Sequence, residues 1–122
     1  MSSKPVRNSS KFLEQIVQKI PVDTQVVGVV CGFSFEWPTC RELIKQIRRA
    51  LPNKLIIGGG EHVTALPKES LIGSDLDIGV LGEGEETALE IVDQVARDDK
   101  DFSRILGIAY KDGTNDVRTN GR

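Results

Sequence analysis

The chain has 122 residues, of which 39% are hydrophobic and 28% charged, so it is long and apolar enough to fold around one core. The near balance of 16 basic and 18 acidic side chains, together with only 5% aromatic residues, excludes the basic surface or stacking platform of a nucleic-acid binder and disfavours an anionic membrane as partner. Two cysteines exclude a disulfide scaffold, and without an apolar segment of signal-peptide or membrane-spanning length we expect a cytoplasmic protein.

The amino-terminal part divides into a polar segment and a helix. Residues 1–10 are mostly polar and are expected to be flexible, ahead of a single domain over residues 11–122. Apolar residues at helical spacing predict a first helix that Pro21 ends, with a buried face formed by Phe12, Leu13, Ile16, Val17 and Ile20.

The rest of the chain alternates apolar strands with helical patterns. Strands are predicted at residues 25–31, 55–57, 78–81 and 105–110. Helices are predicted at residues 39–51, 63–72 and 85–97. The second of these three is short. The third shows Leu89, Val92, Val95 and Ala96 on one side.

This alternation predicts right-handed crossovers and a three-layer α/β domain with a parallel sheet, Rossmann-like and of the flavodoxin-like kind. Compared with other folds of this kind, the predicted domain lacks one strand and one helix at its amino-terminal end. Residues 117–119 are expected to pair back onto the last predicted strand, because the turn-forming Lys111-Asp112-Gly113 lies between them, and to form a C-terminal hairpin.

Three successive strands are followed by glycine-containing segments, namely Gly32-Phe33-Ser34, Gly58-Gly59-Gly60 and Gly82-Glu83-Gly84. The carboxyl ends of parallel strands meet at one edge of the sheet, where open α/β domains bind ligands. Glycine there lets a flat ligand lie against bare backbone, although each glycine alone would also be explained by a tight turn. Three such segments on one edge favour a binding site.

A ligand bound mainly through its phosphate groups is disfavoured at this edge. Residues 82–87 approach the dinucleotide-binding pattern Gly-x-Gly-x-x-Gly but have threonine in place of the third glycine. The carboxylates of Glu83, Glu85 and Glu86 would repel phosphate, and they suit the positive end of a helix dipole instead. The Gly-Lys-Ser/Thr of a P-loop is absent.

His62, the only histidine, directly follows the triple glycine and is expected at the edge of the crevice. It either contacts a ligand there or caps the start of a helix. A single histidine and two distant cysteines build no zinc site. Cys31 or Ser34 would offer a nucleophile for His62 as base, but no residue orients the histidine, so catalysis is disfavoured. Nearby aromatic residues either pack in the core or form an apolar wall for a flat ligand: Phe33, Phe35 and Trp37.

Three ordered motifs resemble the cobalamin-binding domain of cobalamin-dependent radical S-adenosylmethionine (SAM) proteins. Residues 57–67 contain that family's Gly-Gly-x-His-x-Thr-x-x-Pro, and residues 80–87 contain its Gly-Glu-Gly-Glu. Residues 107–113 match its Gly-Ile-x-Tyr-x-x-Gly. The resemblance extends from about Val26 to the end of the chain and implies a Rossmann-like domain with a corrin ring held over the strand ends.

The resemblance also implies which residues contact the cofactor: Gly32, Phe33, Ser34, Gly59, Gly60, His62, Thr64, Gly82, Glu83 and Gly84. It assigns no catalytic residue. The Asp-x-His-x-x-Gly sequence that supplies a lower cobalt ligand in other cobalamin proteins is absent, so no metal ligand is assigned. Because the chain has no Cys-x-x-x-Cys-x-x-Cys, a 4Fe-4S cluster and SAM would belong to a radical SAM catalytic domain, present in cis or in trans.

Three functional hypotheses follow. The leading one is a cobalamin-binding module of a radical SAM protein that is not catalytic alone. The alternative is an incomplete structural or partner-docking fragment that does not bind cobalamin, and whose open sheet edge favours a homodimer. The third, less favoured, is a small-molecule enzyme that uses His62 and Cys31. Neither nucleic acid nor a membrane is expected as a partner.

Overall fold

The computed structural model describes residues 25–30, 37–82, 85–112 and 116–121. The predicted flexible segment, the first predicted helix and Cys31 lie outside them. The strands are β1 (Val26–Val30), β2 (Leu55–Gly59), β3 (Ile78–Val80), β4 (Ile108–Lys111) and β5 (Val117–Asn120). The helices are α3 (Trp37–Ala50), α4 (Glu61–Ala65), α5 (Pro67–Ile72) and α6 (Glu85–Ala96), with a 3-10 helix, η2 (Phe102–Arg104).

The strands form one sheet in the order β1-β2-β3-β4-β5. β1, β2 and β3 are parallel, as the buried apolar runs predict, and β4 and β5 form the predicted hairpin. The α/β class of the fold is therefore confirmed. The sheet is mixed rather than wholly parallel, however, because β4 runs antiparallel to β3.

The reversal of β4 follows from the path of the chain after α6. The connecting segment returns to the carboxyl end of β3 before β4 begins, and there the backbone N–H of Leu81 donates to the carbonyl of Gly107 at 2.9 Å. Ile108 then lies opposite Val80, and the strand runs back along β3. The first residues of the predicted strand 105–110 belong to this returning segment instead.

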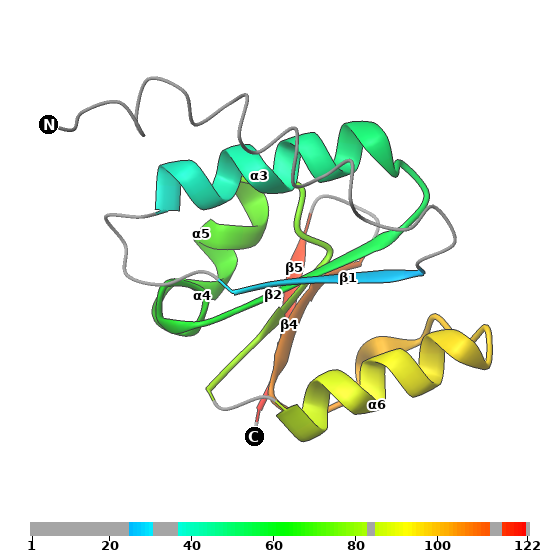
Figure 1. Ribbon diagram of the computed structural model, residues 1–122. Coiled ribbons are helices and arrows are strands. Elements are labelled where there is room, and N and C mark those ends of the chain that lie inside the picture. Colours follow the sequence, from blue (N-terminus) through cyan, green and yellow to red (C-terminus); the bar gives the residue numbers. More distant parts are fainter. Residues whose placement is uncertain (1–24, 31–36, 83–84, 113–115, 122) are drawn as a thin grey trace, which may run out of the picture.

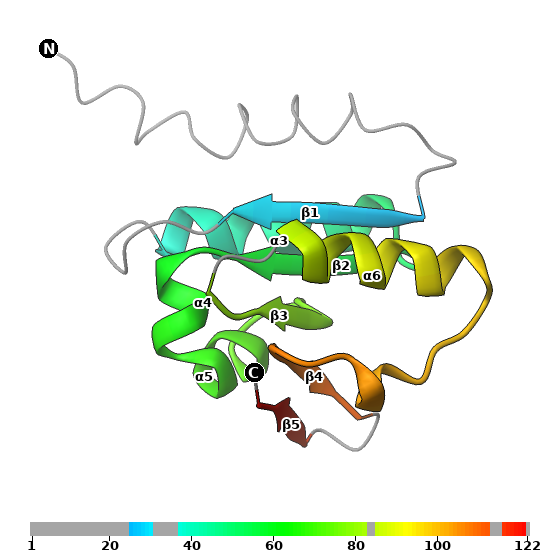
Figure 2. The ribbon, with the colours of Figure 1, turned by 90° about the horizontal axis from the view of Figure 1, so that it is seen from below.

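Helices cover the two faces of the sheet unequally. α3, α4 and α5 lie on one face and α6 lies on the other, which Figures 1 and 2 show in two views. The core on the face of α3 includes Ile44, Ile56 and Leu71, all fully buried. The core on the face of α6 includes Ile91 and Ile108, also fully buried. We call these the α3 face and the α6 face.

Of the side of α6 that the sequence predicts to be buried, only Val95 packs against the core, where it is half-buried. Ile91 and Gln94 are its buried residues. Leu89 is 69% exposed and Val92 45% exposed. The helix carries two neighbouring apolar stripes, and the sheet buries only one of them.

At the amino ends of the strands, the last turn of α3 is tied to the sheet. The guanidinium of Arg48 forms a salt bridge with Asp77 and donates hydrogen bonds to the carbonyls of Pro52, Lys54 and Asp75. Asp77 also accepts a hydrogen bond from the backbone N–H of Ile56 at 2.8 Å. This network fixes the end of the sheet opposite to the glycine-containing segments. In the described part of the chain, no helix is both long and apolar enough to cross a membrane.

Candidate functional site

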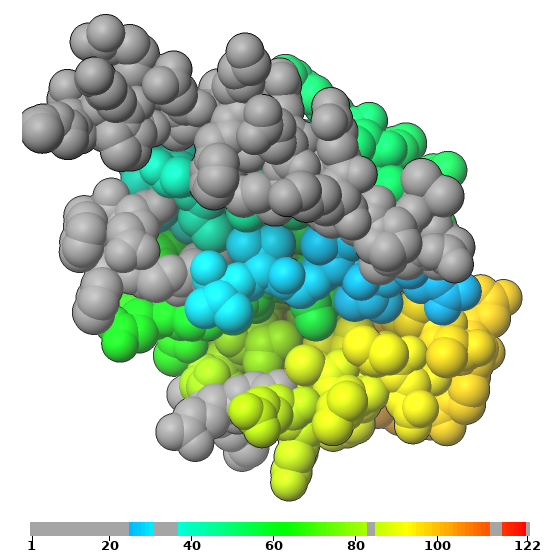
Figure 3. Space-filling view, in the orientation of Figure 1, coloured from blue at the N-terminus to red at the C-terminus, as the bar shows by residue number. Residues whose placement is uncertain are grey.

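A groove of about 370 Å³ lies at the carboxyl ends of β1, β2 and β3, beside the first turns of α6. We call it the glycine groove, because glycines from all three parts of this edge line it. Its lining residues are Gly28, Val29, Val30, Ile57, Gly58, Gly59, Gly60, Val80, Gly82, Glu85 and Ala88. Figure 3 shows β1 at the molecular surface next to α6, and both elements contribute lining residues to the groove. The strand ends thus converge as the glycine pattern predicts.

Two glycines form a floor without side chains on the α6 face. Gly28 pairs with Ile57 across β1 and β2, and Gly59 lies two residues further along β2, so all three belong to one face of the sheet. A Cβ added to Gly28 would lie 3.8 Å from the nearest Ile57 atom, and one added to Gly59 would lie 3.9 Å from the Val80 carbonyl oxygen. Both are ordinary contact distances. The protein's own packing therefore does not require glycine at either position, and the space that a side chain would fill is the groove.

Two other glycines serve the packing of the opposite face. A Cβ on Gly58 would lie 2.8 Å from Leu76, and one on Gly79 would lie 2.7 Å from Val63. Both distances are too short for carbon atoms in contact. Glycine at these positions lets the helices of the α3 face approach the sheet closely, a structural role that is separate from the groove.

The turns that follow β2 and β3 each use a left-handed glycine. Gly60 has φ 105° and Gly82 has φ 74°, conformations that residues with side chains rarely adopt. Each lets the chain leave its strand sharply and start the next segment at the rim of the groove.

The groove is apolar. Among the described residues that line it, Glu85 alone carries an ionisable side chain, and that side chain is exposed. Valine, isoleucine and bare backbone make up most of the remaining surface. Such a surface suits a flat, uncharged group and offers no cation to hold a phosphate. Among the described residues, no group of three His, Cys, Asp or Glu side chains is arranged to hold a metal ion.

His62 and Thr64 do not line the groove. His62 is 7% exposed, and its ring stacks on that of Trp37 with centroids 4.4 Å apart and 15° between the ring planes. The Thr64 hydroxyl accepts a hydrogen bond of 2.9 Å from the backbone N–H of Gly82. The expectation that His62 projects from the crevice edge is therefore not matched by its position, because its ring is covered by Trp37.

Five of the predicted contact residues lie outside the described residues: Gly32, Phe33, Ser34, Glu83 and Gly84. Phe35 lies outside them too. The structure brings Gly59, Gly60 and Gly82 together in the groove. Sequence reasoning overlooked Gly28, although a glycine inside a run of valines signals a close approach to a strand. It also overlooked Val30 and Ala88, which resemble ordinary core residues in the sequence.

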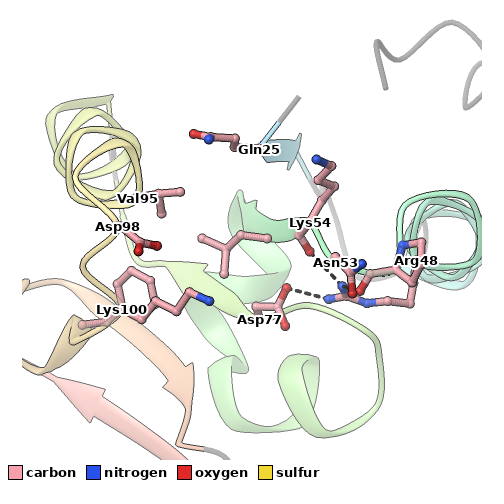
Figure 4. A pocket seen from close by; sticks show the side chains of 11 residues that line it. Gln25, Arg48, Asn53, Lys54, Asp77, Val95, Asp98 and Lys100 are labelled. Carbon is pink, nitrogen blue, oxygen red and sulfur yellow. Dashed lines mark hydrogen bonds and ion pairs between the residues drawn. The ribbon is translucent and has the colours of Figure 1, made fainter. Parts of the chain in front are cut away.

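A second cavity, of about 450 Å³, lies at the opposite end of the sheet (Figure 4). Arg48 and Asp77 line it and are joined to each other, so its central charges already have partners within the protein. Lys54, Asp98 and Lys100 add charges of both signs. Open α/β sheets bind ligands at the carboxyl ends of their strands. The smaller glycine groove is therefore the candidate site.

Comparison with known sequence families identifies the chain. Residues 4–92 match the profile of the B12 binding domain. The chain belongs to the B12-binding domain family. The resemblance inferred from the three sequence motifs is thereby confirmed. The glycine groove therefore lies in a domain of this family.

Two kinds of relative accompany this family match. The chain is 27% identical over 112 residues to 2-(S-pantetheinyl)-carbapenam-3-carboxylate methyltransferase of Streptantibioticus cattleyicolor. Its fold is similar to that of the radical SAM methyltransferase TsrM from Kitasatospora setae, solved with cobalamin and a [4Fe-4S] cluster bound, with a TM-score of 0.73 and 20% identity over 92% of this chain. The cobalamin-dependent SAM radical enzyme OxsB gives a TM-score of 0.65 and 16% identity over 93% of this chain.

These relatives are much longer proteins. The aligned region covers 87% of this chain but only 16% of the carbapenam methyltransferase. It covers 21% of TsrM and 15% of OxsB. This B12-binding domain therefore corresponds to one part of each relative.

Proposed function

We propose that the chain binds cobalamin at the glycine groove, as the cobalamin-binding module of a radical SAM protein, with the corrin at the carboxyl ends of the parallel strands. The observation that carries this proposal is the bare floor at Gly28 and Gly59, where the protein's own packing leaves room for side chains that are not there. Membership of the B12-binding domain family indicates which flat ligand would lie on that floor.

The residues present fit part of such a ligand. A groove of about 370 Å³ lies within the usual range for small-molecule sites and takes a flat, apolar portion of the molecule. Gly59, Gly60 and Gly82 are the described residues that were predicted as contacts and that do line the groove. Val30 and Ala88 add apolar contact on either side.

The division of chemistry is simple in this proposal. Cobalamin held at the groove would supply a cobalt ion able to carry a methyl group. The chain's own residues bind the ligand, orient it and exclude water from the buried part. A radical SAM domain, in cis or in trans, would supply the 4Fe-4S cluster and SAM, as would fit the solved TsrM complex.

Reconstitution with hydroxocobalamin tests the proposal directly. The protein is incubated with an excess of the ligand, separated by gel filtration and examined by visible absorption. We expect corrin absorbance to elute with the protein in a ratio approaching one to one. A folded protein, by circular dichroism, that elutes without corrin absorbance would contradict the proposal.

Variants that fill the floor locate the site. Gly59→Ala and Gly28→Ala place a methyl group in the groove at ordinary contact distances from the protein's own atoms. We expect either change to weaken hydroxocobalamin binding at least about tenfold, equivalent to ~1.4 kcal/mol, while the fold is kept. Gly121→Ala, where an added Cβ meets no atom within 4 Å, is the matched control and should bind like the wild type. Unchanged binding in both groove variants would place the ligand elsewhere.

A second candidate function is self-association through β1, the strand at one edge of the described sheet. Within the described residues, β1 pairs with β2 alone, and it carries five residues without charge or proline. Val30 at its end is 85% exposed. Exposed, uncharged edge strands are templates for pairing with another chain. A second copy would fit, because two antiparallel β1 strands related by a two-fold axis near Gly28 present the same residues to each other.

A further inference from the structure

We infer that His62 and Thr64 are positioning residues that fasten the turn after β2 to the segments on either side of it, and so hold the rim of the glycine groove in one shape. Their effect on a ligand rests on the proposed function. The fastening itself does not, because it is a property of the protein alone.

The first fastening joins α4 to α3. Trp37 opens α3, the helix that follows β1, and the His62 ring lies against its indole at 4.4 Å between centroids. The ring planes are 15° from parallel, so the two rings are stacked. Trp37 also packs against the core of the α3 face. The stack therefore connects the start of α3, and through it the core, to the turn that leaves β2.

The second fastening joins α4 to the turn after β3. The Thr64 hydroxyl oxygen accepts the backbone N–H of Gly82 at 2.9 Å. Gly82 lines the groove and has the left-handed φ of 74°. A backbone N–H at such a turn needs a partner, since an unpaired one within the protein costs free energy. Thr64 provides that partner and sets where the third strand end lies relative to the second.

Both side chains project from the same short, well-anchored helix. Within α4, the N–H of Thr64 donates to the carbonyl of Gly60, and the N–H of Leu66 donates to the carbonyl of His62. Val63, between the two positioning residues, is fully buried and would touch any side chain at Gly79. Figure 2 shows α4 at the end of the sheet toward which the arrows of β1, β2 and β3 point. α4 is thus anchored in the core, and its side chains contact the start of α3 on one side and the turn after β3 on the other.

The position of His62 distinguishes two roles that the sequence motif alone does not distinguish, namely contact with the cofactor and positioning of the groove's rim. A histidine that bound the cofactor would have to present a ring atom to the groove, but the ring is buried against Trp37 and absent from the lining. Loss of either fastening should loosen the rim and weaken binding, without altering how the cobalt of a bound cobalamin is coordinated. Another aromatic side chain at position 62 that stacks on Trp37 should therefore preserve ligand binding.

Thr64 is tested without any ligand. Thr64→Val keeps the shape of the side chain and removes the acceptor, whereas Thr64→Ser keeps the hydroxyl. We expect the amide of Gly82 to exchange its hydrogen about tenfold faster or more in Thr64→Val, as observed by NMR, and to stay within about threefold of the wild type in Thr64→Ser. Equal exchange in all three proteins would overturn this half of the inference.

His62 is tested with hydroxocobalamin. We expect His62→Ala to weaken binding about tenfold and His62→Phe, which keeps a ring against Trp37, to bind within about threefold of the wild type. The visible spectrum of the bound ligand should be the same in the wild type and in His62→Phe. If His62→Phe binds as poorly as His62→Ala, or shifts that spectrum, the stack on Trp37 is not what His62 contributes, and this half of the inference is overturned.

Two safeguards keep the outcomes distinct. Should His62→Ala not fold, the pair Trp37→Phe and Trp37→Ala tests the same stack from its other side, with the same expected order of affinities. If the folded wild-type protein binds no hydroxocobalamin, the proposed function fails, while the Gly82 exchange rates still decide whether Thr64 fastens the rim.

Discussion

At the scale of single residues, neighbouring glycines in β2 do different things. Gly58 faces Leu76 across a gap too small for a methyl group, while Gly59 faces the groove and has free space. The sequence shows only an unbroken triple glycine, and nothing in it distinguishes the members. The distinction arises because successive residues of a strand face opposite sides of the sheet. Which of the two glycines faces packed helices is known only once the helices on each face are placed.

This difference predicts opposite effects of one methyl group. Gly58→Ala should lower the free energy of unfolding by about 1–3 kcal/mol, because Leu76 has to move from its packed position. Gly59→Ala should leave it unchanged or raise it by up to about 1 kcal/mol, since alanine restricts the unfolded chain more than glycine does. Urea unfolding of both variants measures the difference. Equal destabilisation by the two changes would show that the faces are wrongly assigned.

Sequence reasoning placed Gly59, Gly60 and Gly82 at the carboxyl ends of the strands, where they line the groove, because the position of a strand end can be read locally in the sequence. Their contact with a cofactor stays a prediction. It did not place His62, because the partner that buries this ring, Trp37, lies one crossover earlier in the chain. A stacked pair of this kind has no sequence spacing to reveal it. The role of Thr64 was likewise hidden, since its partner is a backbone amide in the next loop.

At the scale of elements, the segment between α6 and β4 decides the direction of β4. Two side-chain amides hold it. Gln94 donates to the carbonyls of Asp99 and Asp101, the latter at 2.7 Å. Asn120 donates from β5 to the carbonyls of Phe102 and Ile105, at 3.0 and 2.8 Å. These bonds give side-chain donors to backbone carbonyls of the connecting segment, so the chain can turn back before β4 begins.

Removal of the Asn120 amide should therefore destabilise the protein. We expect Asn120→Ala to lower the free energy of unfolding by about 1–3 kcal/mol, because the Ile105 carbonyl loses its amide donor and the Phe102 carbonyl keeps only the backbone N–H of Ile105. Asn53→Ala, at an exposed position, is the control and should change it by less than about 0.5 kcal/mol. Urea unfolding compares the two. A cost at Asn120 no greater than at Asn53 would contradict the assignment.

The elements themselves were mostly readable in the sequence. Apolar runs without alternation identified β1 to β3, and β3 is buried on both faces as such a run predicts. β1 is buried only on the α3 face, because its Gly28 and Val30 are exposed on the α6 face. The orientation of α6 was not readable, since Leu89 and Val92 form as good an apolar stripe as the one around Ile91. Which stripe the sheet covers depends on tertiary packing and not on the helix alone.

At the scale of the whole molecule, the two edges of the sheet differ. β5 carries Arg118, which forms a salt bridge with Asp112, and the exposed Thr119. Charged and polar side chains of this kind protect an edge from pairing with other chains. The described part of β1 has no such protection, and Val30 is almost fully exposed. The predicted homodimer would therefore form through β1.

Charging one edge at a time tests this homodimer. We expect the wild-type protein to be dimeric at micromolar concentration by light scattering coupled to gel filtration. Val30→Lys should shift it to a monomer, because a buried lysine at the pairing edge has no partner. Thr119→Lys, the equivalent change on β5, should leave the dimer intact. A monomeric wild-type protein, or a dimer broken only by Thr119→Lys, would contradict the β1 interface.

Among the described residues, α6 leaves Val30 of the neighbouring strand and its own Leu89 exposed to water. A ligand bound there would bury apolar surface that is otherwise exposed. Its binding would therefore raise the thermal stability of the protein. By mass action, free ligand at 100 times its dissociation constant adds about 2.7 kcal/mol to the stability of a protein that binds it only when folded. An empty copy would then be the form most readily degraded, and supply of the ligand would set how much of the protein persists.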